Sequence, residues 1–146
     1  MILINNISSS DIENKDEVIT LSNEAANYLS SFNWCKKINN GWVAKEFGYI
    51  LSVFYFEIEP DKEKNADNNV WIIVGDIPSV YIDIESANNA DDALKCYCLI
   101  MEDWINCVKN GESIEECYPI NVPATIEYAI MLESRIKLIK SDFIDS

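Results

Sequence analysis

The sequence predicts an α+β fold, in which an antiparallel sheet of three to four strands carries helices on one face, in the order helix, strands, helix, helix. Three observations support this prediction. Apolar residues recur at three- and four-residue spacing within residues 16–38, 89–111 and 124–141. Aromatic and branched residues fill residues 42–60 and 71–84. The connections between these strands are too short for parallel crossovers, so we expect a meander.

The first helix is predicted by the spacing of Val18, Leu21, Ala25 and Leu29, and the polar residues that follow Ile38 are expected to end it. Residues 1–16 contain few apolar side chains before this pattern begins, and we expect them to be flexible. A chain of 146 residues has the length of one ordinary domain, so residues 1–146 are assigned to a single domain.

The strand region contains two connections of different character. Residues 42–60 form one long strand or two short ones that end at Pro60, and the polar residues 61–69 then form a loop. In the stretch WIIVGDIPSVYIDI, Gly75 to Ser79 join two apolar runs. Asp76 in this joint is either an ordinary turn residue or a carboxylate held out for chemistry. Aspartate is common in turns because its side chain bonds the local backbone, which favours the first interpretation.

The helix within residues 89–111 has the clearest pattern in the chain. Asn88 or Asn89 can cap its start, and Gly111 suits the left-handed residue that follows many helices. Pro119 and Pro123 mark the linker to the last helix. The apolar stripe of this helix consists of Leu94, Tyr97, Cys98, Met101, Trp104, Ile105 and Val108.

Charge is the feature that departs most from the average. The chain has 25 acidic and 11 basic residues, with a net charge of -14. Residues 1–75 hold 11 acids and 6 bases, residues 76–116 hold 10 and 2, and residues 117–146 hold 4 and 3, which gives balances of -5, -8 and -1. Such a field repels nucleic acid and anionic membranes, so we expect neither as a direct partner. A basic protein is the natural complement.

Catalytic and metal chemistry find little support in the composition. The chain has no histidine, which removes the commonest general base and metal ligand. Five cysteines are an odd number, and the start of the chain has no basic segment of a signal peptide, so we expect reduced thiols and a cytoplasmic location. Cys96 and Cys98 lie two apart on a predicted helix and point in different directions, unlike zinc ligands. We expect no catalytic residues, no metal and no cofactor.

Three stretches, WIIVGDIPSVYID, ANNADDALKCYCLIMEDWINCVKNGESIEECYPI and VPATIEYAIMLESRI, resemble a family of small acidic bacterial proteins of uncharacterised function. The shared pattern is a strand that starts with Trp, a Gly-Asp-hydrophobic-Pro turn, a helix with a buried Trp and a last helix with Leu and Arg. The resemblance covers residues 71–135. These proteins are similar to the immunity proteins of contact-dependent inhibition and other polymorphic toxin systems, many of whose toxins are nucleases.

The charge and the resemblance together predict an immunity protein that is not an enzyme. It would bind a basic toxin domain, expected to be a nuclease, through its acidic surface and so block the toxin. Aromatic residues such as Trp42, Tyr81 or Tyr118 could lie at the centre of that interface. The candidate partner-binding residues are Asp76, Tyr81, Asp83, Glu85, Asp91, Asp92, Glu102, Asp103, Glu112, Glu115 and Glu116.

Other interpretations remain open from the sequence. The charge supports equally well a nucleic-acid mimic that inhibits a DNA-binding protein. A carboxylate enzyme that uses a divalent ion, with Asp76 exposed at its turn, is a second alternative. A scaffold subunit of a larger assembly is a third.

Overall fold

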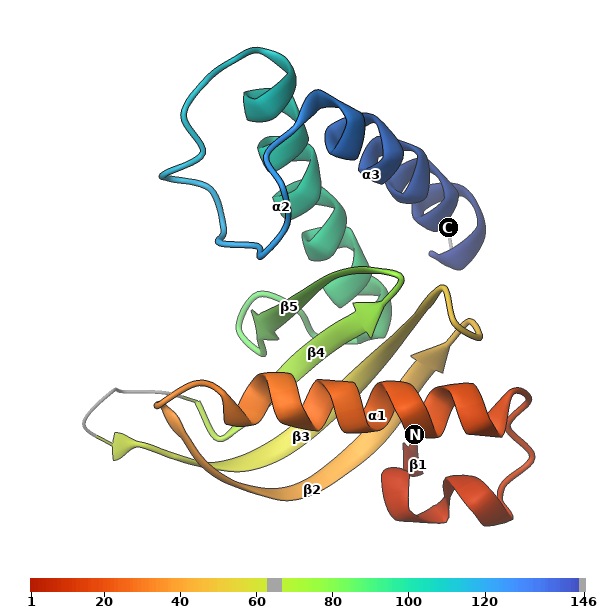
Figure 1. Ribbon diagram of the computed structural model, residues 1–146. Coiled ribbons are helices and arrows are strands. Elements are labelled where there is room, and N and C mark those ends of the chain that lie inside the picture. Colours follow the sequence, from red (N-terminus) through yellow and green to blue (C-terminus); the bar gives the residue numbers. More distant parts are fainter. Residues whose placement is uncertain (63–66, 145–146) are drawn as a thin grey trace.

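The computed structural model describes residues 1–62 and 67–144 (Figure 1). The polar loop expected at 61–69 therefore lies partly outside the described residues. A five-stranded antiparallel sheet in the order β1-β2-β3-β4-β5 forms the centre. The elements are β1 (Ile2–Leu3), the 3-10 helix η1 (Ile4–Ser9), α1 (Lys15–Ser30), β2 (Cys35–Glu46), β3 (Leu51–Pro60), β4 (Asn69–Gly75), β5 (Ile77–Asp83), α2 (Ala90–Lys109), α3 (Ile126–Leu138) and the π-helix η3 (Ile139–Phe143).

The predicted α+β class and the antiparallel meander are confirmed, but the sheet has five strands instead of three or four. β2 also begins earlier than expected: α1 ends at Ser30, and β2 runs through Asn39, Asn40 and Gly41, which the sequence suggested as the end of that helix. Backbone hydrogen bonds to β3 hold this polar segment in the sheet. The register between β2 and β3 contains three irregularities. The additional strand is β1, which forms a short edge strand beside β2.

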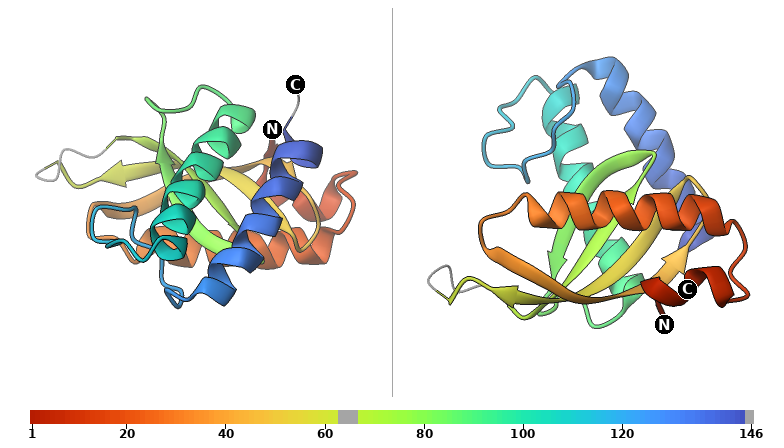
Figure 2. Two further views of the ribbon diagram at one scale, coloured as in Figure 1. Left: turned by 90° about the horizontal axis from the view of Figure 1, so that it is seen from above. Right: turned by 60° about the horizontal axis from the view of Figure 1, so that its bottom comes forward.

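The expectation that helices cover one face of the sheet is wrong, because helices lie on both faces (Figure 2). Side chains alternate between faces along a strand, and both sets are buried in β4. Trp71 and Ile73 join the core under α2 and α3, whereas Ile72 and Val74 join the core under α1. A strand that is apolar on both faces needs cover on both faces.

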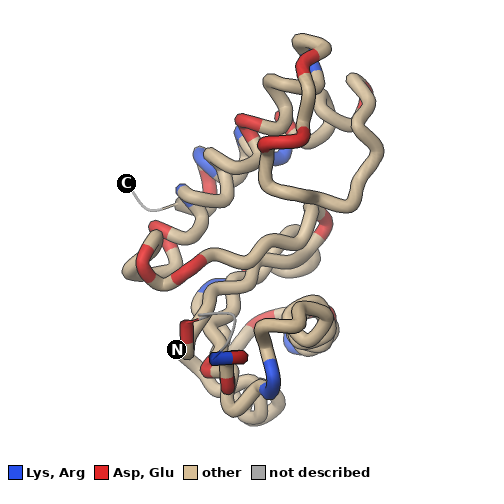
Figure 3. The backbone as a smooth tube through the Cα atoms, turned by 90° about the vertical axis from the view of Figure 1, so that its left-hand side faces the viewer, with Lys and Arg blue, Asp and Glu red and all other residues tan. Residues whose placement is uncertain are grey.

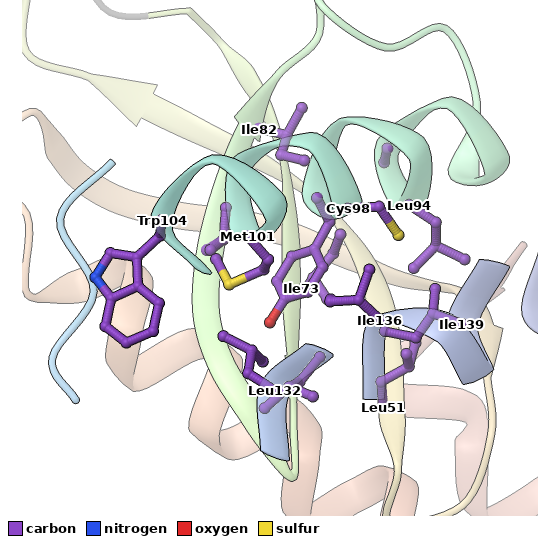
Figure 4. Close-up of a cluster of buried hydrophobic side chains, with 14 of the residues drawn as sticks. Leu51, Ile73, Ile82, Leu94, Cys98, Met101, Trp104, Leu132, Ile136 and Ile139 are labelled. Atoms are coloured by element: carbon purple, nitrogen blue, oxygen red, sulfur yellow. The ribbon is translucent and has the colours of Figure 1, made fainter. Parts of the chain in front are cut away.

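Local signals explain where α2 and α3 begin. The side chain of Asn89 accepts a hydrogen bond from the backbone N–H of Asp92 at 2.8 Å, and Thr125 accepts one from the N–H of Tyr128 at 3.1 Å. Gly111, just beyond α2, has φ +70° as expected from the sequence. Figure 4 shows the apolar face of α2 directed at α3 and the sheet. The contributing side chains include Leu94, Cys98, Met101, Trp104, Leu132, Ile136 and Ile139.

The first residues of the chain pack against the domain, whereas the sequence predicted a flexible segment over residues 1–16. β1 pairs with β2, and Ile7 in η1 is fully buried in the core under α1. Ile4 and Ile12 pack against the same core. The few apolar residues of this segment are therefore the ones that attach it.

Candidate functional site

A cleft of about 730 Å³ opens between the end of α1, the β4–β5 turn, the loop after α2 and the start of α3. We call it the tyrosine cleft. Its volume lies within the range of roughly 300–1,000 Å³ that is common for ligand sites. The side chains that define its character are Tyr28, Phe32, Asp76, Tyr81, Tyr118 and Tyr128.

The hydroxyl of Tyr118 connects three separate segments of the chain. It lies 3.0 Å from the hydroxyl of Tyr28 on α1, and it accepts a hydrogen bond from the backbone N–H of Tyr81 on β5 at 3.2 Å. Burial, followed by the hydrogen bond with Tyr28, raises the pKa of Tyr118 far above its ordinary value. Tyr118 is therefore a neutral hydroxyl at physiological pH, and it holds the loop after α2 against β5.

Aromatic rings continue from Tyr118 into α1. The ring centroids of Tyr81 and Tyr118 are 5.4 Å apart, and those of Phe32 and Tyr81 are 5.1 Å apart in an edge-to-face arrangement. Phe32 stacks on Trp34 at 5.0 Å and meets Tyr28 edge to face at 5.1 Å. These geometries are the favourable ones for ring pairs, so the wall of the tyrosine cleft is held by its own contacts.

Asp76 lies at the rim of the tyrosine cleft, in the turn between β4 and β5. Gly75 before it has φ +153°, a conformation that residues with a side chain rarely adopt. The Arg135 side chain on α3 donates from Nη1 to the Asp76 carbonyl and to Asp76 Oδ2, each at 2.6 Å. Arg135 is the only arginine in the sequence. Asp76 thus acts as a turn residue that also ties the hairpin to α3.

The charged pair acts on a neighbouring tyrosine as well. Burial raises the pKa of Tyr128, the Asp76 carboxylate raises it further, and Arg135 lowers it. Tyr128 in turn lies edge to face against the buried ring of Trp104, with centroids 6.1 Å apart. The rim of the cleft is therefore in contact with the core under α2 and α3.

Seven of the predicted partner-binding residues form two groups in the chain, one just before and at the start of α2 and one in the loop after it. Figure 3 shows the acidic positions in red along the backbone. The turn after β5 lies along the first turns of α2, where the Cys96 thiol donates to the Ser86 carbonyl at 3.3 Å. The loop that follows α2 then returns to β5, where the Tyr118 hydroxyl accepts a hydrogen bond from the backbone N–H of Tyr81 at 3.2 Å. We call Asp83, Glu85, Asp91 and Asp92 the strand-end acids, and Glu112, Glu115 and Glu116 the loop acids.

The other predicted residues lie apart from these groups. Asp76 and Tyr81 belong to the tyrosine cleft, while Glu102 and Asp103 lie in the middle of α2. The predicted set is therefore divided among the cleft, the middle of α2 and the segments that precede and follow this helix. Trp42, another suggested interface residue, lies on β2 beside Tyr55 and does not line the cleft.

Three of the candidate carboxylates are paired with cations. Asp76 pairs with Arg135, Asp91 with Lys45, and Glu102 with Lys140 at 3.1 Å. Six others are exposed and have no ion pair within residues 1–62 and 67–144; these are Asp83, Glu85, Asp103, Glu112, Glu115 and Glu116.

Asp83 combines partial cover by the domain with a neighbouring carboxylate. Partial burial raises its pKa, and the nearby Asp67 carboxylate raises it further. Asp83 lies two residues after Tyr81, on the same face of β5. Negative charge therefore accumulates beside the aromatic residues of that strand.

The cysteines pack in the core or at its edge. Cys98 is buried in the α2 stripe, as its position in the pattern predicts, and burial raises its pKa to about 11. Cys107 and Cys117 have their Sγ atoms 3.7 Å apart, so the loop after α2 is packed against the end of that helix. In the described part of the chain, no group of three or more His, Cys, Asp or Glu side chains could hold a metal ion.

Sequence reasoning named Asp76, Tyr81 and Tyr118 but did not predict that they share a site. Tyr28 and Phe32 were not suggested at all. Tyr28 and Tyr118 are 90 positions apart, and only the sheet and its two helical layers bring them together. A local sequence pattern cannot predict this contact, because the spacing of apolar residues indicates only the type of a single helix or strand.

Residues 22–141 match a family described as Domain of unknown function (DUF4826). The matched part begins within α1 and includes β2 to β5, α2 and α3, so it contains every element that forms the tyrosine cleft. Neither the curated proteins nor the solved structures that were compared with the chain gave a match. Because the matched residues make up well over half of the sequence, the chain belongs to the DUF4826 family.

Proposed function

We propose that this protein is a non-enzymatic immunity protein, which binds a basic toxin domain and blocks it. The observation that supports this most strongly is the surplus of exposed carboxylates between Asp83 and Glu116, six of which have no ion pair in the described part of the chain. Exposed charge of one sign destabilises a small domain by self-repulsion, and a bound partner of opposite charge reduces this repulsion.

The separation of the acidic groups agrees with one interface of ordinary size. A standard interface buries about 800 Å² on each partner, and a round patch of that area is about 30 Å across. α2 has about that length, and the loop after it returns to β5, where the Tyr118 hydroxyl accepts a hydrogen bond from the N–H of Tyr81. Both groups can therefore lie at the rim of a single interface, where charges mainly set the association rate and its salt dependence.

The proposed partner is a toxin that uses Lys and Arg to hold nucleic acid, and a nuclease domain has that chemistry. Carboxylates of the immunity protein would pair with those cations and exclude the substrate. Such a toxin reaches its substrate in the cytoplasm, so the proposal also places this protein there. No helix in residues 1–62 and 67–144 is both long and apolar enough to cross a membrane.

The test uses the protein encoded directly upstream of this one, because immunity genes are expected to lie beside toxin genes. Its carboxy-terminal domain is expressed in bacteria with and without this chain, and growth is followed. We expect growth arrest that this chain relieves. The two purified proteins should then bind each other in about 0.05 M salt, with association at least about tenfold slower in about 0.5 M salt.

Charge variants identify the surface that is used. The test variant removes the loop acids as Glu112→Gln, Glu115→Gln and Glu116→Gln, and we expect association to slow about tenfold at low salt. The matched control removes three exposed carboxylates from the N-terminal region, as Glu13→Gln, Asp16→Asn and Glu24→Gln. Equal effects of both variants would indicate only a general dependence on net charge. Absence of both rescue and binding would contradict the proposed function.

A further inference from the structure

The tyrosine cleft has a chemistry that points to a specific ligand. Tyr28, Phe32, Tyr81, Tyr118 and Tyr128 supply aromatic rings, and Asp76 carries the only charge among the residues that line the cleft. We propose that the cleft binds an arginine side chain of the protein partner. The inference rests on the proposed function for the source of that arginine, but not for the chemistry of the site.

Ring faces are the first part of this argument. The four cleft tyrosines are half-buried, so each ring has one part in contact with the domain and another part open to solvent. The hydroxyls of Tyr28 and Tyr118 are bonded to each other. Where a ring face is open to the cleft, its negative charge distribution attracts a guanidinium group.

Charge is the second part. The Asp76 side chain is 69% exposed, and Arg135 bonds its Oδ2 atom, whereas no described residue bonds its Oδ1 atom. The loop that carries Tyr118 also carries the loop acids Glu112, Glu115 and Glu116, all of them exposed. No lysine or arginine lines the cleft. A cation that enters therefore meets the exposed Oδ1 atom of Asp76 and the loop acids, and the positive charge nearest to it is that of Arg135, which pairs with Asp76 Oδ2 at the rim.

The third part of the argument is the ion pair between Arg135 and Asp76 at the rim of the cleft. Arg135 reaches the carbonyl and the carboxylate of Asp76 with one nitrogen, at 2.6 Å to each oxygen. This contact shows that the turn presents its oxygens in a form that suits a guanidinium group. Arginine fits better than lysine, because a planar guanidinium can stack on a ring and donate hydrogen bonds at its edge at the same time.

The volume of the tyrosine cleft favours a peptide segment over a free small molecule. A cleft of about 730 Å³ is much larger than one guanidinium group. Pro78, Pro119, Val122 and Met131 supply apolar wall for the aliphatic stem of an arginine and for the residues beside it. The occupant is therefore a peptide segment with a central arginine, as a basic toxin domain would present.

The test is a titration of the full chain with N-acetyl-arginine methylamide, followed by NMR of carbon-labelled tyrosine rings. The seven tyrosines of the sequence provide their own controls. We expect saturable shifts, with one dissociation constant of about 1 mM, for Tyr28, Tyr81, Tyr118 and Tyr128. We expect no such shifts for Tyr49, Tyr55 and Tyr97, which lie outside the cleft. Tyr49 is 62% exposed, so it reports non-specific contact with the probe.

Two related probes define the chemistry. The citrulline compound has the shape of arginine without its charge, and we expect it to bind at least about threefold more weakly. The lysine compound keeps the charge but cannot stack, and we expect it to lie between the two. Equal affinity of the arginine and citrulline compounds, or equal shifts of all seven tyrosines, would overturn the proposal.

Variants connect the probe to the site. Asp76→Asn should weaken arginine binding about threefold, and Tyr128→Leu should weaken it by a similar factor, while the matched Tyr49→Leu should leave it unchanged. The wild-type titration needs none of these variants to fold. It also needs no toxin, so its failure differs from a failure of the proposed function. If the toxin is captured but Tyr128→Leu leaves its affinity unchanged, the cleft is not the arginine site.

Discussion

The core under α2 and α3 and the tyrosine cleft both contain tyrosine and large aromatic rings, but they use them in different ways. In the core, Trp104 and Tyr97 are almost completely buried, and the Tyr97 hydroxyl donates to the buried Pro78 carbonyl at 2.8 Å. In the cleft, the rings of Tyr28, Tyr81 and Tyr118 are only half-buried, although they contact one another.

This difference separates stability from binding. A ring that is buried on all sides contributes its full area to the hydrophobic stabilisation of the fold. A ring that is held at one edge and open on its face contributes less to stability, and it keeps a surface for a partner. We therefore expect substitutions in the core to act on the free energy of unfolding, and substitutions in the cleft to act mainly on ligand affinity.

Trp104→Ala should have the largest effect on stability. Trp104 is 1% exposed, and removal of a buried Trp side chain leaves a cavity that costs about 3–5 kcal/mol of the free energy of unfolding. The matched control is Trp34→Ala, which removes the same side chain from the half-buried ring cluster beside the cleft. We expect less than half the loss there, measured by urea denaturation. A loss at Trp34 as large as at Trp104 would break the comparison.

Gly75→Ala tests the turn that carries Asp76 to the cleft. A Cβ atom at Gly75 would lie 2.3 Å from the Ile50 carbonyl oxygen and 2.6 Å from Leu51 Cα, and φ is +153°. Backbone atoms cannot move away as a side chain can, so we expect a loss of about 2–3 kcal/mol in the free energy of unfolding. Gly111→Ala is the control, because φ is +70° there but nothing lies within 4 Å. Gly111→Ala should cost about 1 kcal/mol of the free energy of unfolding. A loss at Gly111 as large as the loss at Gly75 would contradict the importance of the backbone contacts at Gly75.

The parts of the fold that local signals specify could be predicted from the sequence. The start of α2 at the Asn89 cap, its apolar stripe and the turn at Gly75 each depend on a few neighbouring residues. The polar run Asn39–Gly41 misled the same reasoning, because β2 forms there through pairing with β3. Pairing is a property of the sheet, and it overrides the weak local preference of the segment.

The site was less predictable than the fold. Charge counting named residues that are exposed, such as Glu115 and Glu116, but it could not show that the loop carrying them folds back onto β5. The cleft depends on Tyr28, Tyr81 and Tyr118, which come from three different elements. Only the placement of helices on both faces of the sheet brings α1 and the loop after α2 to the same edge of β5.

Tyr97→Phe and Tyr118→Phe compare the two regions by removing one hydroxyl from each. Tyr97→Phe leaves the buried Pro78 carbonyl without its donor, which should cost about 1–3 kcal/mol of the free energy of unfolding. Tyr118→Phe removes bonds to Tyr28 and Tyr81 at a half-exposed position, where water can replace them, so we expect about 1 kcal/mol or less. Thermal and urea unfolding of both variants measure the difference. A greater loss at Tyr118 would mean that the cleft is itself part of the stabilising core.

Asp83→Asn should have the smallest effect, and its sign depends on pH. Partial burial and Asp67 raise the pKa of Asp83 above its ordinary value of 3.8, so the folded state holds this proton more tightly than the unfolded state does. The resulting stability is fully present below pH 3.8 and is lost as the pH rises through the folded pKa. At neutral pH, Asp83→Asn should therefore raise the melting temperature, by less than the few degrees that about 1 kcal/mol gives a domain of this size. Glu85→Gln is the control, because it removes an equal exposed charge two residues away. If the two variants are equally stabilising at neutral pH, the gain reflects only the reduced net charge. A larger gain for Asp83→Asn, which disappears near pH 3, would show that the Asp83 carboxylate lowers the stability of the folded state at neutral pH.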